Sequence, residues 1–485
     1  MREFWYGVFG SILGVLAGVA MVIVAAAFLL SAALASLIDS VSAPVRTDAG
    51  PIILEIDLRS RRVVETNPSR GFVTPSRPAA APTILRALHA ASNDPKVDAV
   101  IVYTGGSGEI AAGHAEEIAK ALQRIAATGR RVVGYVEDAG QTGLPGYLAA
   151  AGATEVWASP LARLDVPPAL GFAFSDRAGY QTARLSAIAA MRGTSSEAVT
   201  ALFADGPVPV PAALEAGLID RIGSDYEARA RAIGDTDATQ TGFEDYLASA
   251  PGPDARRMLA LIEVQGAING GEPWDASRDA FAAAVTGRIE TAIRDEAVRA
   301  VILRISSHEA DAAAADQIAQ AIRRAQQAGK PVVVSVGEGL TGWAYYAVAP
   351  ADQIVTPALA ALGGLGTAQD RLPASLAPRT ERADAPPRTA VEEYRYELLL
   401  EAVAETRSLP IARVEALARG RLWTGRQAVE RGLADEIGGL NAAAERARAL
   451  AGAPGDDSLV LTPYPPAPGP LERALGRAWS ELTSR

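Results

Sequence analysis

The stretches Val97-Asp-Ala-Val-Ile-Val102 (VDAVIV) and Val298-Arg-Ala-Val-Ile-Leu303 (VRAVIL) decide the fold class of this chain. Both are short apolar runs rich in β-branched residues, which is typical of strands buried on both faces. Each is followed by an alanine-rich segment with helical spacing and then by another run of valines. Strands that alternate with helices in this way predict parallel βαβ units and therefore an α/β fold.

The same order of segments returns about 200 residues later. The segment Ile118–Leu122 (IAKAL) in the first half corresponds to Ile318–Ile322 (IAQAI) in the second. This period is far longer than that of a solenoid repeat, so it indicates two homologous domains. We expect tandem domains at residues 50–232 and 256–452, a polar linker at 233–255, and a proline-rich tail with a short helix at 453–485.

The composition excludes several classes of function. The net charge is −10 and no basic patch stands out, which argues against a nucleic-acid partner. The chain has no cysteine, so disulfides, thiolate chemistry and cysteine-based zinc sites are excluded. The three histidines, His89, His114 and His308, have no metal-ligand spacing, and we expect each at the surface or in a turn. We expect no metal and no cofactor.

The N-terminal region is long and apolar. From Phe9 to Ile38 the sequence contains no charged residue. A spanning helix needs about 20 apolar residues, whereas the apolar part of a cleaved signal peptide has about 7–15. We therefore expect an uncleaved transmembrane anchor at residues 8–38. The chain would then be a single-pass protein of the inner (cytoplasmic) membrane, with most of its residues on the non-cytoplasmic side.

A motif near the C-terminus resembles a known family. The segment 421–439 (RLWTGRQAVERGLADEIGG) is similar to the closing signature of the S49 peptidases, the family of signal peptide peptidase A, and a weaker copy lies at 213–223. The resemblance implies a Clp-protease or crotonase-like fold for each domain, and the long, duplicated, membrane-anchored form of the family. It also implies assembly into rings and peptide hydrolysis by a serine and a lysine.

The resemblance places the nucleophile at an unexpected residue. The family's Ala-Ser-Gly-Gly-Tyr turn falls on Thr341–Tyr345, with Gly342 at the position of the serine. The neighbouring Thr341 is the only candidate nucleophile, but we favour a role for it as the cap of a helix that begins at about Gly342. Trp343, Tyr345 and Tyr346 form either a wall for a bound peptide or part of the core.

The other two elements of the family's chemistry are also missing. The glycine-containing turn that would form the oxyanion hole falls on His308, Glu309 and Ala310, after Ser307, and it places a carboxylate where an anion would develop. The chain has three lysines, and none lies between residues 121 and 329, where the resemblance would place the base. Arginine cannot replace a catalytic lysine, because it does not deprotonate at working pH.

Three functions remain to be compared. The preferred hypothesis is a membrane-anchored pseudopeptidase of the S49 family that binds peptides, or assembles with itself or with a related peptidase. The alternative is an active serine-type or threonine endopeptidase that degrades signal peptides or membrane-proximal peptides. An acyl-CoA enzyme of the crotonase type is disfavoured, because the oxyanion glycines are absent. The glycine-rich segment 105–108 suggests a phosphate cradle or, more simply, the first domain's copy of the oxyanion turn.

Overall fold

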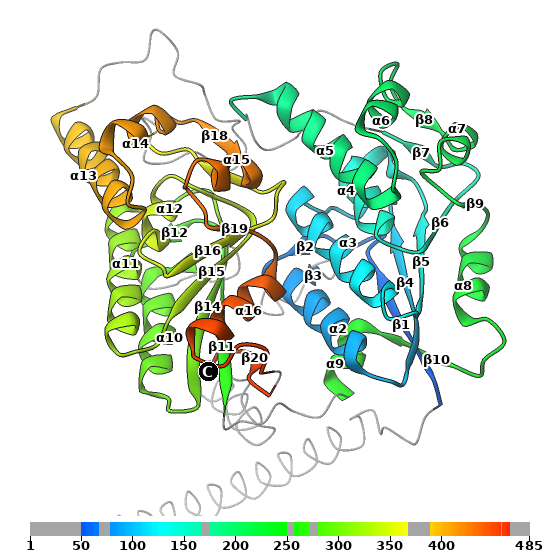
Figure 1. Cartoon of the computed structure of the whole chain (residues 1–485), viewed down its shortest axis with the longest axis horizontal. Helices are drawn as coiled ribbons and strands as arrows, with labels where there is room; N and C mark the ends of the chain where they lie inside the picture. Colours follow the sequence, from blue (N-terminus) through cyan, green and yellow to red (C-terminus); the bar gives the residue numbers. More distant parts are fainter. Residues whose placement is uncertain are drawn as a thin grey trace, which may run out of the picture. The chain divides into compact units, whose positions relative to one another are not determined.

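The computed structural model describes residues 50–66, 78–165, 174–249, 257–271, 280–366, 389–456 and 458–465. All of these residues belong to one compact unit, Asp48–Pro465. Two largely parallel sheets organise this unit (Figure 1). We use "first lobe" for the part built on the first sheet, within residues 50–249, and "second lobe" for the part built on the second sheet, within residues 257–465.

The first lobe contains a six-stranded sheet with the order β10-β1-β4-β5-β6-β9, in which every neighbouring pair is parallel. Its second strand in the chain, β4, is buried at every position except Asp98, because helices cover both faces of the sheet. The strands are β1 (Ile52–Asp57), β4 (Val97–Thr104), β5 (Arg131–Val136), β6 (Glu155–Ala158), β9 (Arg221–Ile222) and β10 (Thr239–Gly242).

The second lobe contains an eight-stranded sheet with the main order β18-β17-β15-β14-β11-β20, and β16 pairs with β15 and β19. Its pairs are parallel except for β17 with β18. The strands are β11 (Met258–Gln265), β14 (Val298–Ser307), β15 (Val332–Thr341), β16 (Gln353–Thr356), β17 (Ala361–Gly363), β18 (Leu422–Thr424), β19 (Glu436–Ile437) and β20 (Val460–Pro463).

Helices and three short strand pairs complete the described chain. The helices of the first lobe are α2 (Ala81–Asn93), α3 (Ala112–Ala126), α4 (Ala139–Ala151), α5 (Arg177–Arg192), α6 (Ser196–Leu202), α7 (Val210–Glu215), α8 (Asp225–Ile233) and α9 (Phe243–Ser249). Those of the second are α10 (Ala282–Arg294), α11 (Ala312–Gln327), α12 (Trp343–Val348), α13 (Ala390–Thr406), α14 (Ile411–Leu417), α15 (Gly425–Glu430) and α16 (Leu440–Leu450). The strand pairs are β2 (Val63–Val64) with β3 (Ala79–Ala80), β7 (Arg163–Leu164) with β8 (Val208–Pro209), and β12 (Ile268–Asn269) with β13 (Ala280–Phe281).

The two lobes share a hydrophobic core. Helix α16 lies beside α2 of the first lobe (Figure 1), although it is encoded some 350 residues later. Its residues Leu440, Ala443 and Ala447 belong to the same buried cluster as Leu85 and Leu88 of α2. The boundary between the lobes is therefore part of the protein interior, and a polar group placed there has to find its partner within the protein.

The expected α/β class is confirmed. The two lobes share an order of elements, β4-α3-β5-α4-β6 and β14-α11-β15-α12-β16, and a buried tyrosine lies in α4 and in α12. The hydroxyl of Tyr147 donates to the carbonyl of Leu218, and that of Tyr345 to the carbonyl of Leu433. These features support the prediction of two related domains, which remains a prediction.

The expected linker and tail both contribute strands. Within 233–255, β10 pairs with β1 and α9 packs against α2. Within 453–485, β20 pairs with β11, and the residues after 465 lie outside the described part of the chain.

The predicted anchor at residues 8–38 also lies outside the described residues. Among the helices that the structure describes, none is long and apolar enough to cross a membrane. This finding does not bear out the prediction of an inner-membrane location, which is therefore withdrawn.

Candidate functional site

The candidate site lies at the turn from β15 to α12. Strand β15 ends at Thr341, and α12 begins at Trp343, with Gly342 between them. Gly342 has φ 59° and ψ −132°, a conformation that residues with a Cβ adopt only under strain. Its amide donates to the carbonyl of Gly363 at 2.8 Å. The backbone here therefore requires glycine for conformational reasons, whatever chemistry the turn supports.

Thr341 does not cap the helix. No side chain caps α12, and the hydroxyl of Thr341 donates to the carbonyl of His308 at 2.8 Å. The cap prediction was wrong because Thr341 is still part of the strand, so its side chain points across the sheet to the end of β14. Thr341 is 8 % exposed, and its hydroxyl is held by this bond.

The turn at 308–310 is fixed by its backbone. The carbonyl of Glu309 accepts bonds from the amide of Ile268 at 2.9 Å and from the hydroxyl of Ser307 at 3.0 Å. The amide of the following residue, Asp311, donates to the carbonyl of Ile268 at 2.8 Å. His308 is exposed, Glu309 half-buried and Ala310 buried. The structure thus brings the predicted turn and Thr341 into direct contact.

The three predicted aromatic residues separate into two groups. Tyr345 is fully buried, and its hydroxyl bonds Leu433 at 2.7 Å, so it is a core residue. Trp343 and Tyr346 are half-buried and meet edge to face, with ring centroids 5.2 Å apart. The hydroxyl of Tyr346 also donates to Asp316 at 3.1 Å. Trp343 and Tyr346 keep some exposed area beside the strand-to-helix turn.

The lysines are placed away from this turn or engaged elsewhere. Lys330 precedes β15 and donates to carbonyl oxygens at the end of α10, one of them Ala292 at 2.8 Å. It therefore lies at the opposite end of the strand from Gly342, on the order of 30 Å away at about 3.3 Å per residue. Lys120 pairs with Glu116 at 2.6 Å, and Lys96 is exposed in a turn.

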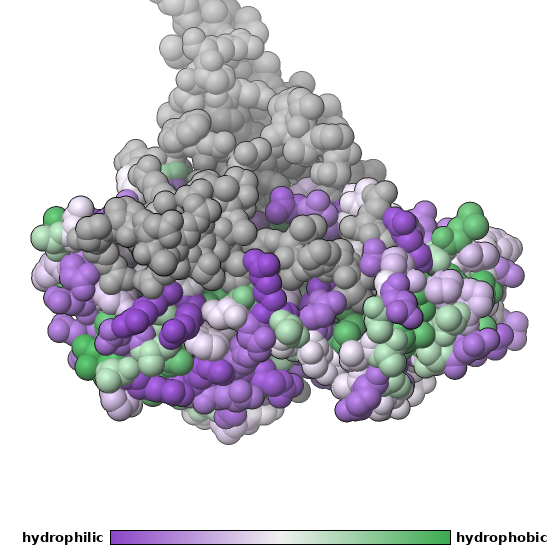
Figure 2. Space-filling view, turned by 90° about the horizontal axis from the view of Figure 1, so that it is seen from above, coloured by the Kyte–Doolittle hydropathy of each residue, from purple (hydrophilic) through white to green (hydrophobic). Residues whose placement is uncertain are grey.

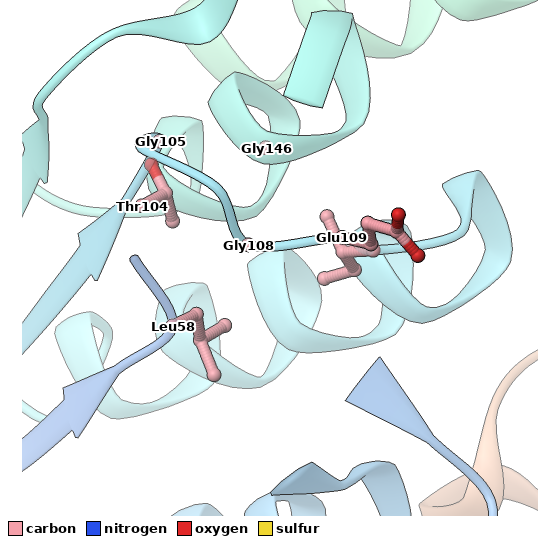
Figure 3. Close-up of a pocket in the computed structure, with 7 residues that line it drawn as sticks. Leu58, Thr104, Gly105, Gly108, Glu109 and Gly146 are labelled. Carbon is pink, nitrogen blue, oxygen red and sulfur yellow. The ribbon is translucent and has the colours of Figure 1, made fainter. Parts of the chain in front are cut away.

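In the glycine-rich turn of the first lobe, residues 105–108, the backbone of neighbouring segments fills the space beside the glycines. A Cβ on Gly108 would meet the carbonyl of Leu58 at 1.9 Å, and one on Gly105 would meet the amide of Asp138 at 2.6 Å. The cavity at this turn holds about 10 Å³, the space of a single water (Figure 3). These glycines thus allow close approach of neighbouring strands and loops, and the cavity is too small for a phosphate group.

Sequence reasoning missed a cluster of buried charges between the lobes. Glu65, which follows β2, accepts bonds from Nε2 of His114 at 2.6 Å and from the hydroxyl of Ser306 at 2.8 Å. Its other oxygen accepts from Nε of Arg304 at 2.8 Å. Arg304 also donates to both oxygens of Glu117, at 2.8 and 2.6 Å. We call these five residues the seam.

The seam joins the lobes with charged hydrogen bonds. Glu65, His114 and Glu117 come from the first lobe, and Arg304 and Ser306 from the second. None of the five is more than 5 % exposed. Two amides add to the cluster, since Leu440 donates to Glu117 at 2.8 Å and Glu338 donates to the hydroxyl of Ser306 at 2.7 Å.

The seam also changes the acidities of its members. Burial raises the pKa of Glu65, but the charges of Arg304 and His114 outweigh it and hold that pKa well below its usual range. Burial lowers the pKa of His114, and the Glu65 carboxylate more than offsets this, so the pKa lies above its ordinary value. Burial, with Glu65 nearby, raises the pKa of Glu263 to about 7.

His114 is therefore neither at the surface nor in a turn, and that expectation was wrong. It lies within α3 and is 1 % exposed. Two signals could have found the seam. Arg304 has apolar neighbours on both sides in its strand, and His114 and Glu117 share a helix face with Ile118 and Ala121. Charges in such buried-type segments require partners.

The view of the described surface in Figure 2 shows no large hydrophobic patch. In this view the surface is mostly hydrophilic, with hydrophobic residues in small scattered groups. The well-exposed large apolar residues of the described chain include Leu161, Tyr226, Val391 and Tyr394.

Comparison with known proteins identifies relatives of this chain. Residues 380–453 match Peptidase family S49. Protease 4 of Haemophilus influenzae is 28% identical over 235 residues, which cover 43% of this chain and 38% of the relative. The chloroplastic serine protease SPPA of Arabidopsis thaliana is 28% identical over 232 residues, covering 42% and 34%. The match thus spans less than two fifths of the length of either relative.

Among solved structures, a ClpP1 mutant from Listeria monocytogenes aligns with 39% of this chain and 95% of its own, with a TM-score of 0.27 and 11% identity. The family match at residues 380–453 and the protease-named relatives together support membership of this chain in the S49, or signal peptide peptidase A, family.

Proposed function

We propose that this chain is a pseudopeptidase of the S49 family, which binds peptides without hydrolysing them. The observation that carries the proposal is the turn at Thr341–Gly342. Position 342 has no side chain, and the neighbouring hydroxyl of Thr341 is committed to the carbonyl of His308. A nucleophile also needs a base to remove its proton, and Lys330 lies at the far end of β15.

The serines near the turn are equally committed. The hydroxyl of Ser306 donates to Glu65, and that of Ser307 donates to the carbonyl of Glu309. The hydroxyl of Ser335 accepts from Arg304 at 3.0 Å within the core. Ser306 and Ser335 are also too deeply buried for a peptide to reach.

Stabilisation of an oxyanion would be weak at this turn. The Glu309 carboxylate belongs to the turn that the resemblance assigns to the oxyanion hole, and it would repel a developing anion. Loss of even one donor of such a hole costs about 10²–10³ in rate. Changing Gly342→Ser alone should therefore not create a peptidase.

Peptide binding is proposed to use the aromatic pair beside the turn. Trp343 and Tyr346 present half-buried rings there, and rings of this kind supply apolar contact area at small entropic cost. Assembly with a second copy of the chain, or with a related peptidase, is part of the same proposal.

The test is binding of fluorescently labelled, unstructured or signal-peptide-like peptides, followed by anisotropy and by mass spectrometry of the recovered peptide. We expect saturable binding with intact peptide recovered, and weaker binding by Trp343→Ala. Tyr226→Ala removes an aromatic residue that is 77 % exposed on α8, and it should bind as the wild type does. Absence of binding, or equal effects of the two changes, would contradict a role for this aromatic pair.

The alternative is an active endopeptidase that uses Thr341. It requires the hydroxyl of Thr341 to leave His308 and to meet a base when substrate binds. Recovery of cleaved peptide in the same experiment would favour it.

A further inference from the structure

The carboxylate of Glu65 is the centre of the contact between the lobes. One of its oxygens accepts from both His114 and Ser306, and the other accepts from Arg304. The segment that carries it is itself held by the second lobe, because Gln265 accepts from the amides of Glu65 and Thr66 at 2.9 and 2.8 Å. Glu65 therefore cannot shift without breaking contacts between the lobes.

Glycines make room for the two carboxylates. A Cβ on Gly337 would lie 1.4 Å from an oxygen of Glu65, and one on Gly439 would lie 2.2 Å from an oxygen of Glu117. A Cβ on Gly113 would lie 2.5 Å from the carbonyl of Gly337, where α3 and β15 touch. The backbone of both lobes thus packs closely around these two carboxylates, and a side chain at any of the three glycines would disturb the seam.

The seam reaches the candidate site through a bulge in β15. Ile305 of β14 faces Val336, and Ser307 faces Leu340, so the register shifts across residues 337–339. The hydroxyl of Ser306 holds the amide of Glu338 inside this bulge while it donates to Glu65. Thr341 lies two residues after the bulge, at the end of the same strand. Loosening of Glu65 would therefore loosen the strand that ends at the candidate site.

The charges of the seam balance only if His114 carries a proton. Glu65 and Glu117 are two anions, and Arg304 is one cation. An imidazolium at His114 makes the sum zero, whereas a neutral imidazole leaves one uncompensated negative charge in a fully buried place. An uncompensated buried charge is costly, and it is not screened as a surface charge is.

The two nitrogens of His114 have different surroundings. Nε2 lies 2.6 Å from Glu65, and Nδ1 has no hydrogen-bond partner among the described residues. Deprotonation would therefore occur at Nδ1, and the Nε2–H would continue to donate to Glu65. The hydrogen bond is kept while the positive charge is lost.

Other charged groups surround this pair. Glu65, Arg304 and Glu338 act on His114 from three segments, and Glu263 of β11 lies near enough to Glu65 to feel its charge. Further titratable or charged groups near this place include Glu116, Glu117, Lys120 and Arg124 of α3, Tyr180 and Arg184 of α5, Arg86 of α2 and Arg288 of α10. Ionisation of Glu263 would add to the negative charge and would act in the same direction as deprotonation of His114.

We propose that the seam is a proton-dependent clasp between the lobes. It is closed while His114 is an imidazolium, and it loosens when the imidazole becomes neutral, which frees the β15 bulge and the start of α16. The inference does not depend on whether the candidate site hydrolyses peptides. Because His114 binds its proton more tightly in the closed seam, closure is fully favoured in acid and is lost as the pH rises above about 6.5.

Hydrogen exchange of the full chain tests this directly. After correction for intrinsic exchange, peptides covering 336–342 and 438–444 should lose protection between pH 6 and pH 9. His114→Gln keeps a donor for Glu65 but not the charge, so its protection should already be low at pH 6. Its further loss up to pH 9 should be smaller than that of the wild type, because only Glu263 still titrates there. His89→Gln, on α2, should respond to pH as the wild type does.

The wild type alone also decides the question, should the variant fail to fold. With three histidines in the chain, carbon-13 labelling of the imidazoles gives three resonances that can be followed with pH. We expect one of these resonances, the one that belongs to His114, to titrate above pH 6.5. Three results would overturn the proposal. They are a neutral His114 at pH 6, protection in the wild type that does not change between pH 6 and pH 9, and a loss of protection with pH in His114→Gln that is as large as in the wild type.

Discussion

Arg304 donates to both carboxylate oxygens of Glu117, with Nη1 at 2.8 Å from Oε1 and Nη2 at 2.6 Å from Oε2. The two residues belong to different lobes, and both are buried. The same carboxylate accepts the first amide of α16 from Leu440, so an anion of one lobe also satisfies a helix start of the other.

Breaking this pair should be costly. Arg304→Met keeps the apolar length of the side chain but leaves Glu117 without a counter-charge and Glu65 with that of His114 alone, so we expect a loss of about 3–5 kcal/mol in the free energy of unfolding. Arg324→Met breaks an exposed pair with Glu290 and should cost less than about 1 kcal/mol. Urea denaturation of both variants measures the difference, and similar small losses would contradict the account of the seam.

Glycine at position 337 should be irreplaceable. In Gly337→Ala the new methyl group would overlap an oxygen of Glu65, so the seam must open or the strand must move. We expect severe destabilisation and poor recovery of folded protein. Gly287→Ala, in helix α10 with no atom within 4 Å of the new methyl group, should instead stabilise by about 0.5–1 kcal/mol. Thermal unfolding of the two variants gives the comparison, and an unaffected Gly337→Ala would refute the packing described.

Glu263 should give the protein a stability that falls with rising pH. Its pKa in the folded state is about 7, raised from 4.5, so folding takes up a proton between these values. The contribution is complete below about 4.5 and is lost as the pH rises through 7, by at most about 3 kcal/mol. Glu263→Gln should flatten this part of the stability curve measured by urea denaturation at several pH values, while Glu290→Gln, on the partly exposed face of α10, should not. A slope unchanged in Glu263→Gln would show that the group titrates normally.

The corresponding tyrosines of the two lobes should behave alike. Tyr147→Phe and Tyr345→Phe each remove the hydroxyl that satisfies a buried carbonyl, at Leu218 and Leu433. Each should cost about 1–3 kcal/mol in unfolding free energy, since an unsatisfied group remains. Tyr394→Phe, on the exposed side of α13, should cost almost nothing. A large effect at only one of the two positions would weaken the proposal that the lobes are copies of one unit.

The sequence predicted the parallel strands well, because buried β-branched runs such as Val97–Val102 have few alternatives to a central strand. It also located the turn after β15 and the family resemblance. It did not predict the hydrogen-bond partner of the hydroxyl of Thr341. That hydroxyl bonds a carbonyl 33 residues earlier in the chain, and no local pattern encodes such a contact.

The seam escaped prediction for a related reason. Glu65, His114 and Arg304 are brought together by the packing of two lobes, and 239 residues separate Glu65 from Arg304. Each residue alone resembled a surface charge. Only the apolar neighbours of Arg304 in β14 hinted that its charge is buried.

Whether the chain is a pseudopeptidase is tested most directly by turnover of unstructured and signal-peptide-like substrates by the purified protein, with Thr341→Ala as the matched control. Loss of the hydroxyl of Thr341 removes one bond to His308 and costs about 1 kcal/mol of stability, which should leave the fold intact. Neither protein should cleave the substrates above the blank, at any pH at which the chain is folded. Clear cleavage by the wild type that disappears in Thr341→Ala would contradict the pseudopeptidase proposal and would establish a threonine nucleophile at this turn.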